Sequence, residues 1–483
     1  MKRLFLLFIV AFAATVSSAA QDVAEIGPKI DKLFTSYNAS TPGVAVAVVI
    51  DGKVAFKKGY GSANLEFTSP ISSRTIFNIA SVSKQFTAFA IYLLEKQGKL
   101  SLEDDIRKFL PELPEYKSTV RIRHILGHTS GIRDQASLLS LAGWQRGDAT
   151  FNDHVLRFIG RQKELNFEPG SQYLYSNTGY TLAAEIVHRI SGKPFAEFVR
   201  ENIFIPLGMN DSYINDDYAK PLRDRADSYE LLEGAYKRVA FNDSTSGASN
   251  LNTTVEDLAK WAINLEQPKV GDAELIRRFS EPSLLNNGEP AVYFRTPTEV
   301  GYHAKGQVVR KTRGVNIRSH GGHAAGYRST FWRFPDQRFA VILLSNDEHF
   351  EQLKNAEAII EMAIGDLMEP PPAESPATPA ATPIPARYSN TLKDYAGRFY
   401  NDELEAFYSA TVTAEKLTFN HVRLGGIALT ETGRDKFSGR IGFPVEIEFV
   451  RNSASEVIGF RVSNFGAKNV RFEKVRDVVT RKE

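Results

Sequence analysis

The pattern of apolar and polar positions predicts two β-hairpins that lie far apart in the chain. Residues 43–61, "GVAVAVVIDGKVAFKKGYG", place two β-rich runs around Asp51-Gly52, a dipeptide that type I′ turns favour because both central residues need positive φ. Residues 329–346, "STFWRFPDQRFAVILLSN", place two further runs around Pro335-Asp336. Each segment therefore predicts a pair of adjacent antiparallel strands.

Helical spacing of apolar residues dominates the chain between these hairpins and just after the second one. The segments are "NIASVSKQFTAFAIYLLEKQG" at 78–98, "TGYTLAAEIVHRISG" at 178–192, "TTVEDLAKWAINLEQ" at 253–267 and "HFEQLKNAEAIIEMAIGDLM" at 349–368. Strands that bracket a helical middle indicate an α+β fold, in which helices flank an antiparallel or mixed sheet, rather than a repeating βαβ fold.

A change in composition divides the chain after residue 368. Residues 369–388 are rich in Pro, Ala and Thr, which bury little surface and favour the extended conformations typical of an interdomain linker. Residues 389–483 then show short alternating runs separated by Gly, Asn and Asp, with no helical period. They predict a second domain, a small all-β barrel or sandwich.

The first twenty residues have the features of a secretory signal peptide. Lys2 and Arg3 precede an apolar run that begins at Leu4, and small residues end at Ala20, which is typical of a cleaved signal. The run is short for a bilayer span, and this disfavours the alternative of an uncleaved anchor. We therefore predict a first domain at 21–368, a secreted or periplasmic location, and no stable membrane insertion after removal of the signal.

Charge and cysteine content exclude several classes of function. The formal net charge is +2, and without Lys2 and Arg3 the chain has 57 basic and 57 acidic residues. This balance predicts no nucleic-acid partner and no electrostatic binding to anionic lipid. The chain contains no cysteine, which excludes disulfides, thiol catalysis and thiolate metal sites.

The start of the helix predicted at 78–98 has two interpretations. Ser81 lies at or beside the N-cap and Lys84 follows one turn later, so both side chains lie on one helix face. A capping box would want Glu or Gln in place of Lys84, and a cation there faces the positive end of the helix dipole. As a catalytic pair, burial would lower the pKa of Lys84 and let it accept a proton from Ser81. The S-x-x-K pattern is expected about twice by chance in a chain of this length. The spacing alone therefore does not decide between the helix-cap and the catalytic interpretation.

Two further segments make the catalytic interpretation specific. Residues 175–177, "YSN", lie in "FEPGSQYLYSNTGY", and residues 320–322, "HGG", directly precede a predicted strand. With residues 81–84, "SVSK", their order and separation resemble the serine β-lactamase and penicillin-binding-protein superfamily, whose motifs are S-x-x-K, S-D-N and K-T-G. Because Tyr-x-Asn replaces S-D-N, the chain resembles the class C β-lactamase-like branch of D-aminopeptidases and esterases. The resemblance covers about Pro42 to Asn346 and includes "IRHILGHTSGI" and "IPLGMNDS".

The resemblance implies roles for three catalytic residues. Ser81 corresponds to the nucleophile that is acylated, Lys84 to the base hydrogen-bonded to it, and Tyr175 to the residue that passes a proton to the leaving group. The fold that it implies is β-lactamase/transpeptidase-like, with an all-helical subdomain beside the antiparallel sheet and the active site in the cleft between them. No metal or organic cofactor is implied.

The resemblance also implies a set of substrate-binding groups. Asn177 corresponds to a contact with the substrate amide, and the backbone N–H groups of Ser81 and His323 correspond to the oxyanion hole. Gly321 and Gly322 would let a peptide or small-molecule substrate approach closely along the strand edge.

The main departure from the family pattern is His320. Many β-lactamases carry Lys at this position, so the fixed positive charge that would hold an antibiotic carboxylate becomes a titratable one. Related peptidases and esterases share His-x-Gly, which favours amide or ester substrates. The prediction is therefore a serine hydrolase that acts through an acyl-enzyme on Ser81, with D-amino-acid-containing peptides or small esters as substrates. The alternatives are a true β-lactamase and a non-catalytic protein that binds a peptidoglycan fragment or another ligand.

Individual residues also have structural interpretations. Taken alone, Tyr175 is an ordinary half-buried aromatic residue and Asn177 is a helix cap before residues 178–192. His124 and His128 lie four residues apart, but the zinc motif H-E-x-x-H also needs a Glu and a third ligand. We therefore expect His128 to be a structural loop residue rather than a metal ligand.

The predicted C-terminal domain resembles the lipocalin-like modules that are appended to some members of this family. Such a module could bind a ligand, cover or shape the cleft, or mediate homo-oligomerisation. Structural support of the first domain is the interpretation that we favour.

Overall fold

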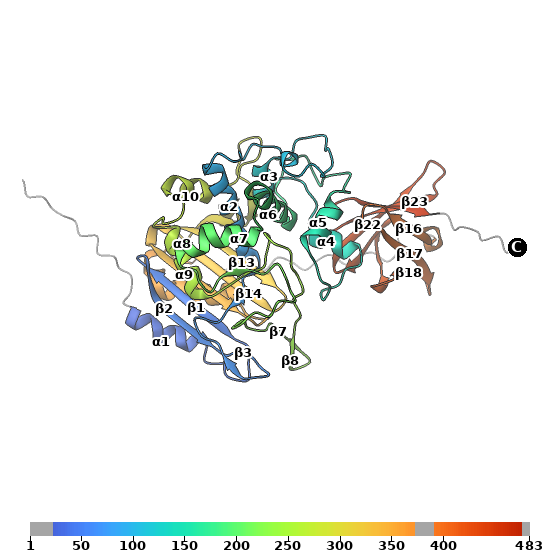
Figure 1. Ribbon diagram of the computed structural model, residues 1–483. Helices are drawn as coiled ribbons and strands as arrows, with labels where there is room; N and C mark the ends of the chain where they lie inside the picture. The colour runs from blue at the N-terminus through green and yellow to red at the C-terminus, as the bar shows by residue number, and fades with distance from the viewer. Residues whose placement is uncertain (1–22, 372–390, 476–483) are drawn as a thin grey trace, which may run out of the picture.

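The computed structural model describes residues 23–371 and 391–475 (Figure 1). The predicted signal peptide, residues 1–20, lies outside the described residues, and so do residues 372–388 of the predicted linker. Within the described part of the chain, no helix is long and apolar enough to cross a membrane. The exact domain boundaries stay predictions.

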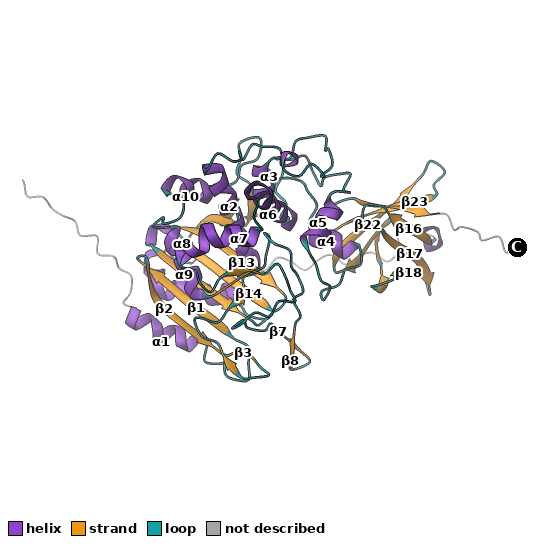
Figure 2. Ribbon diagram, in the orientation of Figure 1, coloured by secondary structure: helices purple, strands orange, loops and turns teal. Residues whose placement is uncertain are grey.

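An antiparallel sheet of eight strands lies at the centre of the N-terminal part (Figure 2). Its order is β10-β11-β12-β13-β14-β15-β1-β2, and the strands are β10 (Val292–Arg295), β11 (Val300–Ala304), β12 (Gln307–Thr312), β13 (Val315–Ala324), β14 (Tyr327–Phe334), β15 (Phe339–Ser345), β1 (Val44–Ile50) and β2 (Lys53–Tyr60). Every pair of neighbours is antiparallel. The predicted sheet, built from both ends of this region, is therefore confirmed.

The two predicted hairpins lie side by side in this sheet. β1 and β2 are joined by Asp51 (φ 50°) and Gly52 (φ 71°), and both residues occupy the left-handed region that a type I′ turn needs. β14 and β15 are joined through a short 3₁₀ turn, Pro335–Gln337. β1 pairs along its whole length with β15, so distant segments form the middle of one sheet.

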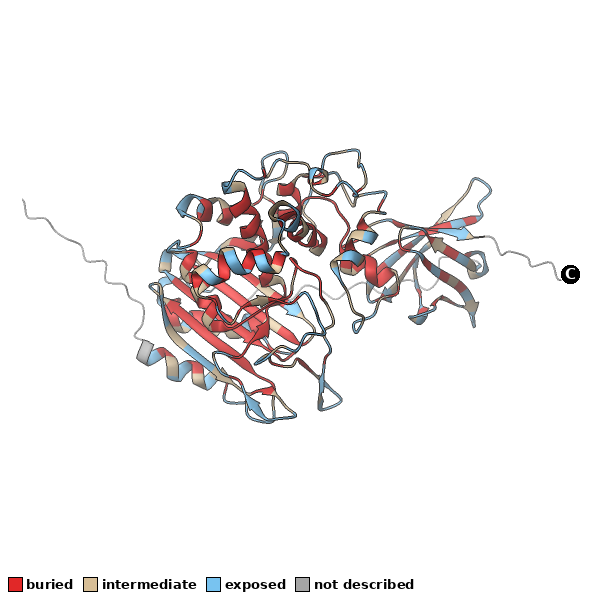
Figure 3. Ribbon diagram, in the orientation of Figure 1, coloured by how far each residue is buried: buried red, intermediate tan, exposed pale blue. Residues whose placement is uncertain are grey.

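Helices cover both faces of the sheet (Figure 1). Alternate valines of β1 pack with α1 (Val23–Leu33) and α11 (Gln352–Ile364) on one face. The alanines between them face α9 (Val255–Asn264) on the other. Because side chains alternate between the faces of a strand, a strand covered on both sides must be apolar at nearly every position. The central strands are accordingly buried (Figure 3).

The helical part packs beside this sheet. Its helices are α2 (Lys84–Lys96), α3 (Ile122–Leu126), α4 (Gln135–Leu141), α5 (Asn152–Ile159), α6 (Asn177–Ser191), α7 (Phe195–Val199), α8 (Ile205–Leu207) and α10 (Ala273–Ser280), with a π-helical turn, Arg200–Phe204, between α7 and α8. α2 and α6 pack against each other, and α6 ends at Gly192 with φ 69°, a left-handed cap. The helices predicted at 78–98, 178–192, 253–267 and 349–368 are confirmed as α2, α6, α9 and α11.

Three groups of short strands lie outside the main sheet. They are β3 (Ser62–Asn64) with β4 (Ser69–Pro70), β5 (Phe77–Asn78) and β6 (Tyr213–Ile214) with β9 (Leu251–Thr253), and β7 (Tyr229–Leu232) with β8 (Ala235–Arg238). The Leu251 N–H donates to the Ser83 hydroxyl at 3.1 Å. Pairing of β5 with β9 therefore brings the chain near residue 250 beside the turn that contains Ser81.

The C-terminal part is an almost closed barrel of nine strands. Its order is β19-β18-β17-β16-β24-β23-β22-β21-β20, and the strands are β16 (Gly397–Asn401), β17 (Ala406–Thr413), β18 (Lys416–His421), β19 (Gly425–Ala428), β20 (Thr430–Gly433), β21 (Lys436–Ile441), β22 (Phe443–Arg451), β23 (Val457–Ser463) and β24 (Val470–Val475). β19 also contacts β21, which nearly closes the ring. The predicted barrel is confirmed, whereas its likeness to lipocalin-like modules stays a prediction.

Aromatic side chains fill the interior of this barrel. Phe399, Phe419, Phe449, Phe460 and Phe472 are all buried, and the rings of Phe460 and Phe472 stack with their centroids 4.7 Å apart. A small barrel whose interior is filled by side chains is a packed core. Its contacts with the rest of the chain are therefore made by its outer surface and its strand connections.

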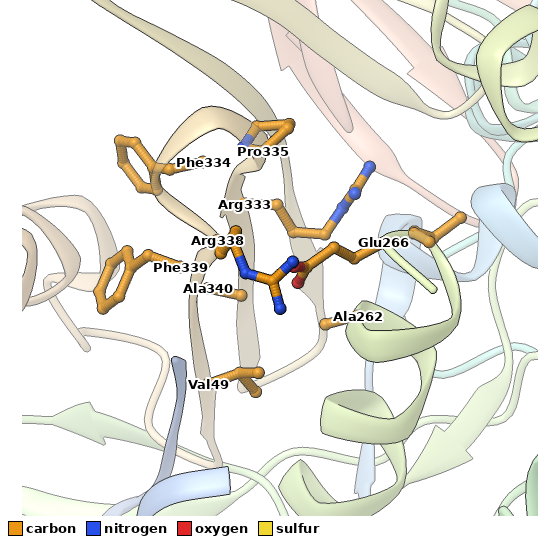
Figure 4. Close-up of a pocket in the computed structure, with 10 residues that line it drawn as sticks. Val49, Ala262, Glu266, Arg333, Phe334, Pro335, Arg338, Phe339 and Ala340 are labelled. Atoms are coloured by element: carbon orange, nitrogen blue, oxygen red, sulfur yellow. The ribbon is translucent and has the colours of Figure 1, made fainter. Parts of the chain in front are cut away.

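A small cavity lies between β14, β15 and α9 (Figure 4). Its volume is 30 Å³, enough for about two water molecules. Arg338 and Glu266 form an ion pair of 3.0 Å at its wall. This volume is too small for a substrate. No predicted site residue lines the cavity, so it is also in the wrong place for one.

Candidate active site

Ser81 lies in a 3₁₀ turn, Ala80–Ser83, that leads directly into α2. The α-helix itself begins at Lys84, two residues later than an N-cap at Ser81 would place it. Ala80 has φ 47°, a conformation that costs energy for a residue with a Cβ. Its N–H donates to Asn78 Oδ1 at 2.8 Å, which supports the tight turn. The tightened backbone leaves Ser81 half-buried while Lys84 is fully buried.

Lys84 is held by three hydrogen-bond partners. Its Nζ lies 2.8 Å from Asn177 Oδ1, 2.8 Å from the Ala248 carbonyl oxygen and 3.2 Å from Ser81 Oγ. A neutral lysine amine has two N–H groups and one lone pair. Because the amide and carbonyl oxygens can only accept, they take the two N–H groups, and the lone pair then faces the Ser81 hydroxyl. The geometry is therefore suited to removal of a proton from Ser81.

Burial sets the protonation state of Lys84. Desolvation lowers its pKa to about 7, and the negative charge of Asp134 opposes this shift. The other titratable groups whose electrostatics couple to Lys84 are the imidazoles of His128, His303 and His320. Near neutral pH a large fraction of Lys84 is thus the free amine that a general base requires.

We expect the acylation rate constant to follow the deprotonation of Lys84. Its logarithm should rise with unit slope as the pH increases toward 7 and level off above this value, since the pKa of Lys84 is about 7. The measurement is the burst of p-nitrophenol release from a small ester between pH 5 and 9 at constant ionic strength. A rate that still rises toward the ordinary lysine pKa of 10.5 would contradict the assignment.

Tyr175 completes the contacts of the nucleophile. Its hydroxyl donates to Ser81 Oγ at 2.8 Å, and desolvation raises its pKa, so it is a neutral phenol that can donate a proton. Its ring packs 4.3 Å from the His128 ring, centroid to centroid. His128 Nδ1 accepts the Ser176 N–H at 3.1 Å, which fits the structural role expected of this histidine. Tyr175 is thus more than an ordinary half-buried aromatic residue.

Asn177 is the first residue of α6 rather than its cap. The N-cap is Ser176, and its side chain makes no capping hydrogen bond. The Asn177 amide instead lies between two buried side chains, with Oδ1 accepting from Lys84 and Nδ2 donating to Asp134 Oδ2 at 3.0 Å. A contact of this amide with substrate stays a prediction, whereas its contact with Lys84 is direct.

β13 places its "HGG" segment against the turn of Ser81. Pairing with β12 ends at Ser319, whereas pairing with β14 continues to Ala324, so among the described strands residues 320–324 have one free edge. A Cβ on Gly322 would lie 2.4 Å from the Ile79 carbonyl oxygen. Gly322 is therefore needed for this close approach to the nucleophile turn, in addition to any approach of substrate.

Alternation along β13 separates the roles of its other residues. Gly321 and His323 face α11, where His323 Nε2 lies 2.5 Å from Gln352 Nε2. His323 can therefore reach the Ser81 side only through its backbone, as the predicted oxyanion contact requires. His320 points to the opposite face and is buried.

His320 is a neutral residue at physiological pH. Desolvation and the nearby charge of Lys84 lower its pKa to about 4. Its Nδ1 lies 2.6 Å from the Gly321 carbonyl oxygen, which can only accept, so Nδ1 carries the hydrogen and Nε2 is an acceptor. Nε2 is buried and has no partner among the described residues. A positive charge for a substrate carboxylate is thus not provided at this position.

His124 and His128 use their rings for different structural hydrogen bonds. His124 Nδ1 accepts the Arg121 N–H at 3.1 Å, and its Nε2 lies 3.3 Å from Asn286 Oδ1. In residues 23–371 and 391–475, no group of three or more His, Asp or Glu side chains is arranged to hold a metal ion. The two histidines therefore do not converge on one site.

Two groups at the site were missed by the sequence interpretation. Asp134 directly precedes α4 and caps it by accepting the Ser137 N–H at 3.1 Å, so a capping signal was present, but it carried no information about Asn177. The Ala248 carbonyl reaches Lys84 only because β9 pairs with β5. No local pattern identifies a backbone carbonyl brought in by such pairing.

The sequence comparisons match this part of the chain to known hydrolases. The family model described as Beta-lactamase matches residues 30–364. Penicillin-binding protein 4* of Bacillus subtilis (strain 168) is 32% identical over 383 residues, which are 74% of this chain and 81% of that protein. The D-aminopeptidase of Gluconobacter oxydans (strain 621H) is 28% identical over 68% of this chain, and the chain spans 60% of the length of that enzyme.

Solved structures share the fold. The octameric penicillin-binding protein homologue from Pyrococcus abyssi has a TM-score of 0.62 and 21% identity, over 94% of this chain and 100% of that one. The D-amino acid amidase from Ochrobactrum anthropi SV3 has a TM-score of 0.57 and 23% identity, over 72% and 99%. With the family match over more than half of its length, the chain belongs to the beta-lactamase family and is a serine hydrolase of the superfamily that includes penicillin-binding proteins and D-aminopeptidases.

Proposed function

We propose that the protein is an exported hydrolase that forms an acyl-enzyme on Ser81 and acts on amides, peptides or esters of D-amino acids. The observation that carries the proposal is the arrangement around Ser81 Oγ, with the Lys84 amine at 3.2 Å and the Tyr175 hydroxyl at 2.8 Å. A base and a proton donor on the same hydroxyl are what acyl transfer requires.

The reaction proceeds in two halves. Ser81 Oγ attacks the substrate carbonyl carbon while its proton passes to Lys84 Nζ, and the carbonyl oxygen becomes an oxyanion facing the N–H groups of Ser81 and His323. The bond from the carbonyl carbon to the amine or alcohol then breaks, and the leaving group takes, through Tyr175, the proton that Lys84 had accepted, so that Lys84 is again a neutral amine. Water next attacks the acyl ester and gives a proton to Lys84. The bond from the carbonyl carbon to Ser81 Oγ then breaks, Lys84 returns its proton to Oγ, and the acid leaves.

The neutral imidazole of His320 favours substrates without a carboxylate beside the scissile bond. Its pKa of about 4 means that it carries no positive charge that could attract such a carboxylate. This supports aminopeptidase, amidase or esterase activity over β-lactam hydrolysis, in line with the D-aminopeptidase names of several relatives.

The non-catalytic alternative is less consistent with the site. A protein that only binds a ligand has no need for a fully buried lysine, since burying an amine without chemistry to perform costs free energy. We also expect export, on the strength of residues 1–20, and homo-oligomerisation. The Pyrococcus abyssi homologue, which covers 94% of this chain, is octameric.

A substrate panel on one preparation tests the proposal. We expect kcat/KM for D-alanyl and D-phenylalanyl amides and methyl esters to exceed that for their L-enantiomers at least about tenfold, which corresponds to roughly 1.4 kcal/mol of transition-state discrimination. Short-chain p-nitrophenyl esters and a chromogenic cephalosporin complete the panel. Rapid turnover of the cephalosporin would instead identify a β-lactamase.

Covalent labelling separates an enzyme from a binding protein. We expect a fluorophosphonate to add to Ser81 of the mature protein, located by mass spectrometry of the peptide. If neither this reagent nor a fluorescent penicillin adds to Ser81 in folded protein, the hydrolase proposal fails.

A further inference from the structure

A strand connection of the C-terminal barrel lies against the loop that precedes α4. The Gly466 carbonyl oxygen accepts the Asp134 N–H at 2.8 Å. Asn166 holds the same barrel segment from the other side, because its Nδ2 donates to the Gly466 carbonyl at 3.0 Å and its Oδ1 accepts the Lys468 N–H at 2.7 Å. The barrel segment at 466–468 is therefore fixed against the catalytic part at backbone level.

The packing at this contact leaves no space. A Cβ on Gly466 would lie 2.5 Å from Asp134 Cβ and 2.8 Å from Ser137 Oγ. The φ of Gly466 is not in the left-handed region, so the absence of a side chain there serves close approach rather than backbone conformation. The barrel touches the loop directly.

An ion pair fixes the neighbouring residue of the same loop to the barrel. Arg133 Nη1 lies 3.1 Å from Glu403 Oε2, and their side chains are only 2% and 12% exposed. Loss of one partner of such a buried pair is costly. The loop before α4 therefore takes its position from the barrel at two successive residues.

Asp134 is connected to the catalytic lysine, Lys84, through the side chain of Asn177. Its Oδ2 accepts both the backbone N–H and the Nδ2 of Asn177, at 2.7 and 3.0 Å. A carboxylate can only accept hydrogen bonds, so it holds the NH₂ end of the Asn177 amide and turns the oxygen end toward Lys84, 2.8 Å away. With the amide reversed, N–H groups would face the amine, and the Lys84 lone pair would no longer be aimed at Ser81.

We propose that the barrel is a structural part of the active site, in which Gly466 positions Asp134, and Asp134 orients the Asn177 amide that aims Lys84 at Ser81. This inference rests on the proposed function of Ser81 and Lys84. Gly466 and Asp134 are positioning residues, and neither touches the reacting atoms. The inference goes beyond a passive support role, because it makes the rate of acylation depend on a residue of the barrel.

A single added methyl group on the barrel tests this dependence in the full-length protein. We expect Gly466→Ala to displace the loop and to lower the acylation rate constant by roughly tenfold or more, the usual loss when a group behind a functional residue is disturbed. The concentration of ester that half-saturates the burst should change little. Gly433→Ala is the matched control, because a Cβ there has no heavy atom nearer than 3.6 Å, and its acylation rate should stay within about twofold of the native rate.

Asp134→Asn provides a readout that simple loss of packing would not produce. Asparagine offers one acceptor oxygen to N–H groups of both Ser137 and Asn177, so one side loses its partner. The acylation rate should fall by roughly tenfold or more. Because the charge of Asp134 raises the pKa of Lys84, the rising limb of the pH profile should also move to lower pH.

The outcomes separate this inference from the proposed function. If native protein acylates Ser81 and Gly466→Ala acylates as fast as Gly433→Ala, the barrel has no part in catalysis and the inference is overturned. If native protein does not acylate at all, the proposed function itself fails. Should Gly466→Ala not fold, as judged by circular dichroism, Asn166→Ala serves in its place, since it releases the same barrel segment without adding an atom. A native acylation rate in folded Asn166→Ala then overturns the inference.

Discussion

Ser81→Ala is expected to abolish formation of the acyl-enzyme and to lower kcat/KM for D-aminoacyl esters by roughly 10⁴-fold or more. Ser81 Oγ is the atom on which Lys84 and Tyr175 converge, at 3.2 and 2.8 Å, and alanine leaves nothing there to acylate. The fold should survive, because Ser81 is half-buried and Lys84 keeps its other two hydrogen bonds. Intact-protein mass spectrometry detects the acyl-enzyme, and steady-state kinetics give kcat/KM.

A second serine in the same turn is the control. Ser83 is fully buried, and its hydroxyl accepts the Leu251 N–H rather than contacting Lys84. Ser83→Ala should therefore lower the melting temperature, since it leaves a buried N–H unpaired, yet it should still form the adduct on Ser81. An adduct or undiminished turnover in Ser81→Ala would show that another residue is the nucleophile.

Lys84→Met is expected to lower the acylation rate constant by roughly 10²- to 10⁴-fold, the usual contribution of a general base. Methionine is chosen because Lys84 is fully buried and an apolar chain of similar length fills the space without the desolvation cost of an amine. The fold should therefore be kept. The limb of the pH–rate profile near pH 7 should disappear, because the group with a pKa of about 7 has been removed.

Lys84→Arg separates proton transfer from charge. A guanidinium stays protonated at every accessible pH, so it keeps a cation next to Ser81 but cannot take the proton. Its rate should stay as low as that of Lys84→Met. Recovery of acylation in Lys84→Arg, or a limb near pH 7 that persists in Lys84→Met, would mean that Lys84 acts through its charge or its packing and not as the base.

Much of the fold follows from local pattern. The Asp51-Gly52 turn and the alternating runs around it form the hairpin β1–β2 as predicted, because a type I′ turn and the strand period are set by residues close together in sequence. The 3.6-residue period likewise predicted α2, α6, α9 and α11. The start of α2 was less well predicted, because the 3₁₀ turn at Ala80–Ser83 depends on its packing against β13 and on the hydrogen bond to Asn78.

Some features of the candidate site were likewise predicted from the sequence, and others are seen only in the structure. Spacing alone placed Ser81 and Lys84 on one face of a helix, and the family pattern added Tyr175, which lies within hydrogen-bonding distance of Ser81. The pKa of His320 was expected to make it a titratable charge near neutrality. Only its position in the structure shows that burial and the charge of Lys84 lower this pKa to about 4.

The sequence by itself determined two hairpins, four of the helices and the β character of the C-terminal part, and it placed a serine and a lysine three residues apart at the start of a helix. Tertiary structure alone decided that Lys84 is buried, that its Nζ lies 3.2 Å from Ser81 Oγ, and that Asn177, Asp134 and Gly466 form a chain of contacts from Lys84 to the barrel. The physical reason is that periodicity records which face of an element is apolar, whereas desolvation and hydrogen-bond partners come from segments that meet only when the chain folds. The basicity of this lysine is therefore a property of the folded protein, barrel included.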